Sequence, residues 1–174
     1  MRSVAAAVVA LLFASCTGAS ALTLTSDDIA PGAKIATAQI YPRCGGRNVS
    51  PALSWSGVPA DAKSLVLTMI DTDVKPAEWS HWIIVDLPPA TTMLPRGTAR
   101  LPLGARAIAS NFGDVSYDGP CPPNGTGVHR YRFTIWAMPT PKTEIAGDAK
   151  ANEVADKLAK TAIASASLVG WVER

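Results

Sequence analysis

Three long runs of strand-forming residues, separated by stretches rich in turn residues, limit what this chain can fold into. The runs span residues 64–71 (SLVLTMID), 81–87 (HWIIVDL) and 129–138 (HRYRFTIWAM). Strands favour the Val, Ile, Leu and aromatic side chains that fill these runs, and Pro, Gly or Asp bounds each of them. Most of the 14 prolines lie in the segments between the runs. The sequence therefore predicts a single domain that is mainly β.

Shorter strands are expected around these runs. Residues 22–26 (LTLTS) and 34–41 (KIATAQIY) have strand-like composition, and residues 53–55 form a short apolar piece that ends before Gly57. Residues 104–108 (GARAI) predict one more short strand.

One helix is predicted, near the C-terminus. Asn152 is a suitable N-cap, and the segment after it places Val154, Leu158 and Ala162 on one side of a helix. We expect this helix to run to about Leu168 and to end at Gly170.

The first residues have the features of a secretory signal peptide. Arg2 supplies a positive charge, residues 4–14 are apolar but too short to span a bilayer, and Ala19-Ser20-Ala21 is a small-x-small cleavage site. The sequence predicts a signal peptide over residues 1–21, cut after Ala21, and one mature domain over residues 22–174.

An alternative for the N-terminus is a lipoprotein anchor at Cys16. Phe13-Ala14-Ser15-Cys16 loosely resembles a lipobox, but Phe stands where such a box usually has Leu. Cleavage after Ala21 is therefore the favoured prediction, and the protein is expected to be secreted or periplasmic.

The charge balance argues against two classes of partner. Without the predicted signal peptide, 15 of the 16 Lys and Arg residues remain against 14 Asp and Glu residues, because only Arg2 is lost. A net charge near zero gives no general attraction to nucleic acid or to an anionic membrane surface, and no second apolar run reaches membrane length. We expect neither nucleic-acid binding nor a stable membrane span, and the protein to be a monomer or a homodimer.

Two cysteines remain after the predicted cleavage, Cys44 and Cys121. An even pair in an oxidising compartment is a disulfide candidate, and both lie in Gly- and Pro-rich loops. Two separate thiols are the alternative. A zinc site is not expected, since two isolated cysteines form no paired-ligand motif.

Three polar residues lie at the ends of predicted strands. Alternation places His81 on one face with Ile83 and Val85, while Asp71 and His129 also end apolar rows. Because strand ends on the core side can form the mouth of a pocket, these three residues are expected to converge on one site.

The chemistry of these residues favours an anion as the ligand. Two imidazoles offer N–H donors, a carboxylate can orient them, and Tyr131 adds a hydroxyl. The loop 119–127 (GPCPPNGTG) is expected to present backbone amides to a phosphate or carboxylate group. Trp79 is expected to form a wall of the pocket. Asp73 either joins the site or only forms a turn.

Five blocks of sequence resemble a known family. The blocks NVSPALSWSGVP, SLVLTMIDTD, EWSHWIIVDLP, YDGPCPPNGTGVHRYRFTIWAM and LVGWVER occur in order along nearly the whole mature chain. They are similar to the phosphatidylethanolamine-binding family, which includes the Raf kinase inhibitor protein, and most similar to its bacterial branch.

The resemblance implies a fold and a site. The implied fold has two antiparallel sheets with a Greek-key element, as in a β-sandwich, and a C-terminal helix. The implied pocket takes phosphate, phosphorylated head groups or similar small anions, without a cofactor or metal. The motifs assign Asp71, Asp73, Trp79, His81, Pro123, His129 and Tyr131 to this pocket.

The chain departs from the family pattern next to Asp71. The family motif D-P-D-A-P is Asp71-Thr72-Asp73-Val74-Lys75-Pro76 here, and the tyrosine that precedes the tryptophan in the family is missing. These changes put the shape of the pocket in doubt. Lys75 adds a positive charge close to the expected mouth.

Two functions from different classes remain. The favoured function is an exported binding protein, with a role as inhibitor or modulator of a partner protein implied only by the resemblance. The alternative is a phosphate-ester hydrolase that uses the histidines and Asp71 as acid and base. Because no nucleophile lies on a recognisable motif, we do not expect an enzyme. A third reading is an interaction protein whose pocket is vestigial.

Overall fold

The computed structural model describes residues 20–145, 149 and 151–174. The predicted signal peptide, apart from Ser20 and Ala21, lies outside the described residues, and so does Cys16. The strands are β1 (Thr23–Thr25), β2 (Leu53–Ser56), β3 (Ser64–Asp71), β4 (Trp79–Leu87), β5 (Met93–Leu94), β6 (Arg106–Ile108), β7 (Val128–Met138) and β8 (Ala164–Glu173). A short 3-10 helix, η1 (Pro42–Cys44), and the helix α1 (Ala151–Thr161) complete the elements. No helix in this part of the chain is long and apolar enough to cross a membrane.

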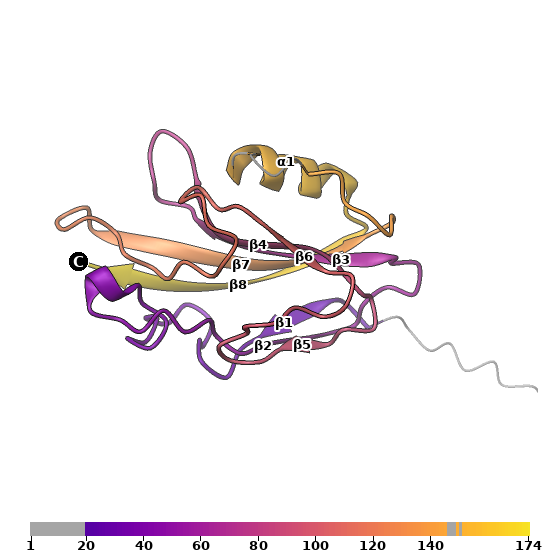
Figure 1. Ribbon diagram of the computed structural model, residues 1–174, viewed down its shortest axis with the longest axis horizontal. Coiled ribbons are helices and arrows are strands. Elements are labelled where there is room, and N and C mark those ends of the chain that lie inside the picture. Colours follow the sequence, from indigo (N-terminus) through magenta and orange to yellow (C-terminus); the bar gives the residue numbers. More distant parts are fainter. Residues whose placement is uncertain (1–19, 146–148, 150) are drawn as a thin grey trace, which may run out of the picture.

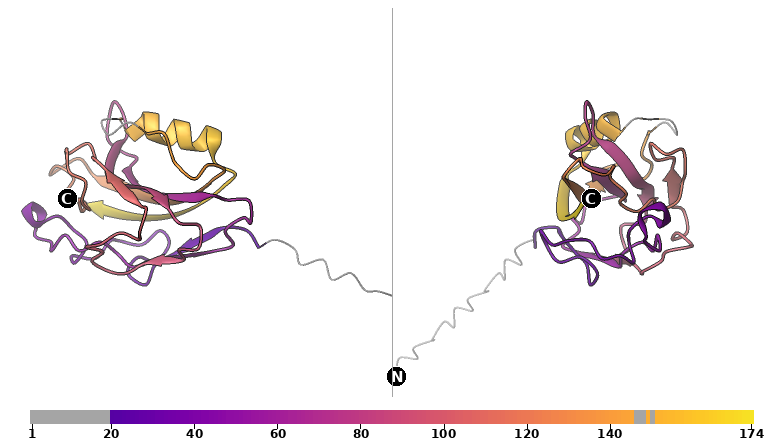
Figure 2. Two further views of the ribbon diagram at one scale, coloured as in Figure 1. Left: turned by 45° about the vertical axis from the view of Figure 1, so that its right-hand side comes forward. Right: turned by 90° about the vertical axis from the view of Figure 1, so that its left-hand side faces the viewer.

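The strands form two antiparallel sheets, as predicted. The larger sheet has the order β6-β4-β3-β7-β8, and the smaller sheet has the order β1-β2-β5. Figure 1 shows the smaller sheet on one side of the larger sheet and α1 on the other. The views in Figure 2 show the same three layers.

Each face of the larger sheet covers a separate apolar core. The first core lies between the two sheets and includes Trp55 of β2, Leu67 of β3 and Phe133 of β7. The second core lies under α1 and includes Ile83 of β4 and Leu158 of the helix. Burial on both faces explains why β3 is buried along its whole length and shows no alternation of apolar and polar residues.

The larger sheet contains a Greek key. Strands β3, β4 and β6 are antiparallel neighbours in sequence order, and β7 returns to pair with β3. The resulting order β7-β3-β4-β6 is the arrangement that defines this motif. It places the end of β3 and the start of β4 beside the start of β7.

The predicted end of the C-terminal helix is wrong. The helix α1 ends at Thr161, and the residues that follow form β8, a full edge strand paired along β7. Ala and Ser are compatible with a helix, but Leu168 and Val172 are buried on the face of the first core, at the spacing of a strand. Gly170 lies inside this strand, where a Cβ atom would approach Ile35 Cγ1 to 2.7 Å.

The strand predicted over residues 34–41 is also not formed. The segment makes turns instead, with hydrogen bonds from the Gln39 amide to the Ala36 carbonyl and from the Ile40 amide to the Thr37 carbonyl. Lys34 alone forms an isolated bridge to β8. The other predicted short strands correspond to β1, β2 and β6.

Candidate functional site

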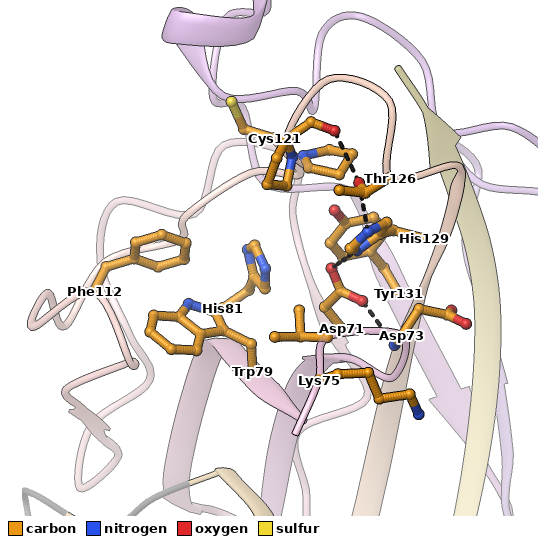
Figure 3. A pocket seen from close by; sticks show the side chains of 13 residues that line it. Asp71, Asp73, Lys75, Trp79, His81, Phe112, Cys121, Thr126, His129 and Tyr131 are labelled. Carbon is orange, nitrogen blue, oxygen red and sulfur yellow. Dashed lines mark hydrogen bonds and ion pairs between the residues drawn. The ribbon is translucent and has the colours of Figure 1, made fainter. Parts of the chain in front are cut away.

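A pocket opens where β3 and β4 meet the start of β7. Its volume is about 650 Å³. All seven residues proposed from the sequence line it, namely Asp71, Asp73, Trp79, His81, Pro123, His129 and Tyr131. Figure 3 shows these side chains converging from the three strands and the loop before β7.

A register shift between β3 and β4 brings His81 into this pocket. Met69 pairs with Trp82, but the next residue, Ile70, pairs with Ser80. His81 is therefore an extra residue in β4 with no partner position on β3. Such a bulge redirects the side chain of the extra residue.

The bulge overturns one expectation from the sequence. Strict alternation would place His81 with Ile83 and Val85, which lie in the second core under α1. The His81 ring instead lies on the opposite face, 5.1 Å from the ring of Tyr131. The prediction that His81 shares a face with Ile83 and Val85 is wrong, although the convergence of the three polar residues is confirmed.

A buried hydrogen bond between an aspartate and a histidine joins β3 to β7. His129 Nδ1 lies 2.6 Å from Asp71 Oδ2, and both side chains are almost fully buried. His129 Nε2 lies 3.0 Å from Thr126 Oγ1, whose hydroxyl also donates to the Pro123 carbonyl. Both nitrogens of this imidazole are therefore held by the protein, which fixes the orientation of its ring.

His81 is held by the loop that follows β6. Its Nδ1 lies 2.7 Å from the backbone oxygen of Asp118, and its ring contacts Phe112 edge to face. Burial is the main cause that lowers the pKa of His81 to about 4; the charge of His129 acts in the same direction, while the hydrogen bond to Asp118 and the charge of Asp71 act against it. His81 is therefore neutral near pH 7.

The charge of the two aspartates is balanced locally. Asp71 is paired with His129, and Asp73 accepts hydrogen bonds from both the backbone amide and the guanidinium of Arg130. Lys75 also lines the pocket and takes part in no ion pair within the described part of the chain. The pocket wall therefore carries no uncompensated carboxylate.

Two donors at the pocket wall are buried without a partner among the described residues. They are the Trp79 indole nitrogen and the Tyr131 hydroxyl, neither of which makes a hydrogen bond of good geometry, although the hydroxyl lies close to the Asp71 carboxylate and to the Cys121 backbone. Burial raises the pKa of Tyr131 above its ordinary value, and the nearby charge of Asp71 raises it further, so the hydroxyl keeps its proton. A buried donor without an acceptor costs about 1–3 kcal/mol, so these groups are unusual in a folded protein.

The loop 119–127 is tied to the rest of the protein. Cys121 forms a disulfide with Cys44, with their Cα atoms 5.5 Å apart, so the predicted pairing is the one in the structure. The Gly125 amide donates to the Arg174 backbone oxygen, and the Gly119 amide donates to Asn48 Oδ1. These two amides are therefore not free for a ligand, contrary to the expectation that the loop presents its glycine amides.

Sequence reasoning missed part of the site. The pocket is also lined by Val74, Phe112, Cys121, Pro122 and Thr126. The last three lie in the loop 119–127, which was expected to contribute its backbone amides, whereas Val74 and Phe112 were not expected at the site. Phe112 is 53% exposed, and an exposed aromatic residue in a turn-rich segment is the signal that could have identified it. Asp118 holds His81 through its backbone oxygen, and a backbone contact of this kind leaves no side-chain pattern in the sequence.

The pocket has few groups of the kinds that carry catalysis in the described part of the chain. The described ranges contain no group of three His, Cys, Asp or Glu residues that could hold a metal ion. Ser80, the hydroxyl next to His81, is fully buried and bonded to Asn111 Oδ1 at 2.8 Å. What remains is a preformed cavity with aromatic walls and a few polar groups, which is typical of a small-molecule site.

Comparison with known proteins agrees with this architecture. The family model described as "Phosphatidylethanolamine-binding protein" matches residues 25–173. The chain is 35% identical over 158 residues to the UPF0098 protein YbcL of Escherichia coli (strain K12), covering 86% of each protein. It is 34% identical over 154 residues to the UPF0098 protein YbhB of the same organism, covering 84% of this chain and 97% of the relative.

Solved structures show the same fold. The crystal structure of E. coli YbcL, described as a new member of the mammalian PEBP family, superposes with a TM-score of 0.82 at 32% identity and covers 89% of this chain and 99% of YbcL. CT736 from Chlamydia trachomatis gives a TM-score of 0.74 at 33% identity, covering 88% of this chain and 98% of CT736. The sequence, the fold and the pocket thus agree, and this chain belongs to the phosphatidylethanolamine-binding protein family.

Proposed function

We propose that this protein is an exported binding protein whose pocket takes a small phosphate-like or carboxylate anion. The observation that carries this proposal is the pair of buried donors at the pocket wall, Trp79 Nε1 and the Tyr131 hydroxyl. Both atoms have almost no accessible surface in the free protein, so an oxygen-rich ligand reaches them only after a small movement of the pocket wall, and it would then supply the acceptors that the described residues do not. Such a ligand would remove the energetic cost of leaving both donors unpaired.

The electrostatics support an anion over a cation. Both pocket carboxylates are already paired with basic groups, Asp71 with His129 and Asp73 with Arg130. Lys75 adds a positive charge on the same wall. An anion therefore meets no net repulsion inside the pocket, although the mature chain as a whole is nearly neutral.

Export is part of the proposal. Its support is the apolar segment over residues 4–14 followed by the small-x-small site at Ala21. A relative with a name that implies export also supports this part of the proposal. LppC of Mycobacterium tuberculosis, which is 36% identical over 155 residues, is named as a candidate lipoprotein. A role as modulator of a partner protein in that compartment rests on family analogy.

The hydrolase alternative gains no support from the site. His129 is bonded through both ring nitrogens, and Ser80 is bonded to Asn111. Neither side chain is therefore placed to activate water or to attack a phosphate ester.

Thermal unfolding with inorganic phosphate and with phosphoethanolamine tests the proposed pocket. A ligand at about 100 times its Kd adds about 2.7 kcal/mol, which corresponds to a rise in Tm of about 5–10 °C for a domain of this size. Tyr131→Phe removes one unpaired donor. We expect this variant to be at least as stable as wild type without ligand and to lose much of the ligand-induced shift.

Tyr117→Phe is the matched control. The Tyr117 hydroxyl is also buried, but it donates to the Gln39 backbone oxygen at 3.0 Å. This variant should lose about 1 kcal/mol of stability and keep the full shift with phosphate. The proposal fails if wild type shows no shift with either ligand, or if the two tyrosine variants respond alike.

A further inference from the structure

The ring of His81 has a defined proton arrangement. A backbone carbonyl only accepts hydrogen bonds, so the 2.7 Å contact with the Asp118 oxygen requires the proton on Nδ1. In the neutral ring, Nε2 then carries a lone pair. The ring also lies near the Gly119 backbone, but Nε2 makes no hydrogen bond of good geometry to a described residue, and His81 lines the pocket. His81 therefore presents an acceptor to the ligand, where the sequence suggested a donor.

The surroundings of His81 keep it neutral. The titratable groups that face it are Asp71 on β3, His129 and Tyr131 on β7, and Asp118 on the loop after β6. The charge of His129 opposes that of Asp71, with which it is paired. The ring of Phe112 packs edge to face against His81, with ring centroids 5.1 Å apart. Figure 3 shows His81 beside Phe112, with Asp71, His129 and Tyr131 in the same pocket.

A fixed acceptor discriminates between oxyanions. The oxygens of a fully ionised phosphate or sulfate carry only lone pairs, so one of them facing Nε2 would leave both groups unsatisfied. A protonated phosphate oxygen donates to Nε2 while the remaining oxygens accept from Trp79 and Tyr131. A site built to bind a ligand hydroxyl rejects the analogue that lacks it.

We propose that His81 selects the singly protonated, monoanionic form of a phosphate group by accepting a hydrogen bond from its P–OH. This inference rests on the proposed function and specifies the ligand class of the same pocket. It applies equally to free phosphate and to a phosphomonoester head group, which share this chemistry.

The test is calorimetric titration of the full chain with phosphate, sulfate and phosphoethanolamine at pH 6 and pH 8. We expect phosphate to bind at least tenfold more tightly than sulfate at pH 6. Because a phosphomonoester loses its second proton near pH 6, its affinity should fall roughly 50-fold by pH 8. The phosphoethanolamine and phosphate arms show whether the head group or the bare anion is preferred.

Sulfate distinguishes this proposal from protonation of His81 itself. If the ring took up the proton on binding, sulfate affinity would rise about tenfold for each unit of falling pH, in parallel with phosphate. Our proposal requires sulfate affinity to change little between pH 8 and pH 6. Equal binding of sulfate and phosphate would overturn the inference but leave the anion pocket standing, whereas no binding of any of the three would overturn both.

A substitution provides a second, independent test. His81→Asn keeps an amide donor for the Asp118 carbonyl but removes the acceptor at the Nε2 position. We expect the affinity of this variant for phosphate to fall to within about threefold of that for sulfate, with sulfate affinity nearly unchanged. An undiminished preference for phosphate would contradict the role of His81.

Discussion

Replacing Asp71 by alanine is expected to lower the free energy of unfolding by about 3–5 kcal/mol. The carboxylate lies 2.6 Å from His129 Nδ1, with only a few per cent of either side chain exposed. It also accepts the backbone amide of Asp73 at 3.0 Å. Removal would leave both donors without an acceptor in a buried position, and chemical unfolding monitored by tryptophan fluorescence would measure the loss.

Asp73→Ala is the matched control for this prediction. Asp73 is also a pocket carboxylate paired with a basic residue, but its partner Arg130 has a side chain that is 58% exposed. An exposed pair contributes about 1 kcal/mol or less. Similar losses of stability in the two variants would contradict the view that the Asp71–His129 pair organises the pocket. The loss in Asp71→Asn should lie between the two, because the amide oxygen of asparagine still accepts a hydrogen bond from His129 Nδ1.

Acid should destabilise the protein through His81. The pKa of His81 is about 4 in the folded protein against 6.5 for an unperturbed histidine, chiefly because of burial. Above pH 6.5 the ring is neutral in both states, so its stabilising effect is complete. As the pH falls from 6.5 to 4, the unfolded chain binds a proton that the folded chain does not, so the free energy of unfolding falls by about 3 kcal/mol in total.

The contribution of His81 can be separated from other titrating groups. His81→Asn cannot titrate, so the difference in stability between wild type and variant isolates the ring. Asp118, whose pKa is raised by burial, acts in the opposite direction but is present in both proteins. We expect the difference to shrink by about 3 kcal/mol between pH 6.5 and pH 4. A difference that is independent of pH would show that the ring is not buried in its neutral form.

Strand composition was sufficient to predict most of the larger sheet. Residues 64–71 and 129–138 correspond to β3 and most of β7, because long apolar runs between turn residues leave few alternatives. The last strand was missed because Ala164–Ser167 is a run of small residues that a helix also accepts. Its assignment to β8 depends on pairing with β7, which is a long-range contact.

The candidate site was predicted in its membership but not in its geometry. Motif resemblance named seven of the thirteen residues that line the pocket, and all seven do line it. The bulge at His81 could not be predicted, since it depends on how β3 and β4 pair and not on either sequence alone. Likewise, the sequence does not show that a backbone oxygen fixes the His81 tautomer, and this contact changes the ring from a donor to an acceptor.

The central claim is that an anion binds beside Trp79, and the indole N–H signals of the five tryptophans test it most directly. Three of these groups already have acceptors: Trp55 donates to the Thr91 oxygen, Trp136 to Thr68 Oγ1 and Trp171 to the Gly32 oxygen. Trp79 Nε1 has none among the described residues. In a ¹H–¹⁵N NMR titration with phosphate, one indole signal should move to saturation, and it should be the one that is missing in Trp79→Phe. If the Trp79 signal stays in place at saturating phosphate concentrations, or if a different indole moves instead, the pocket is not the anion site.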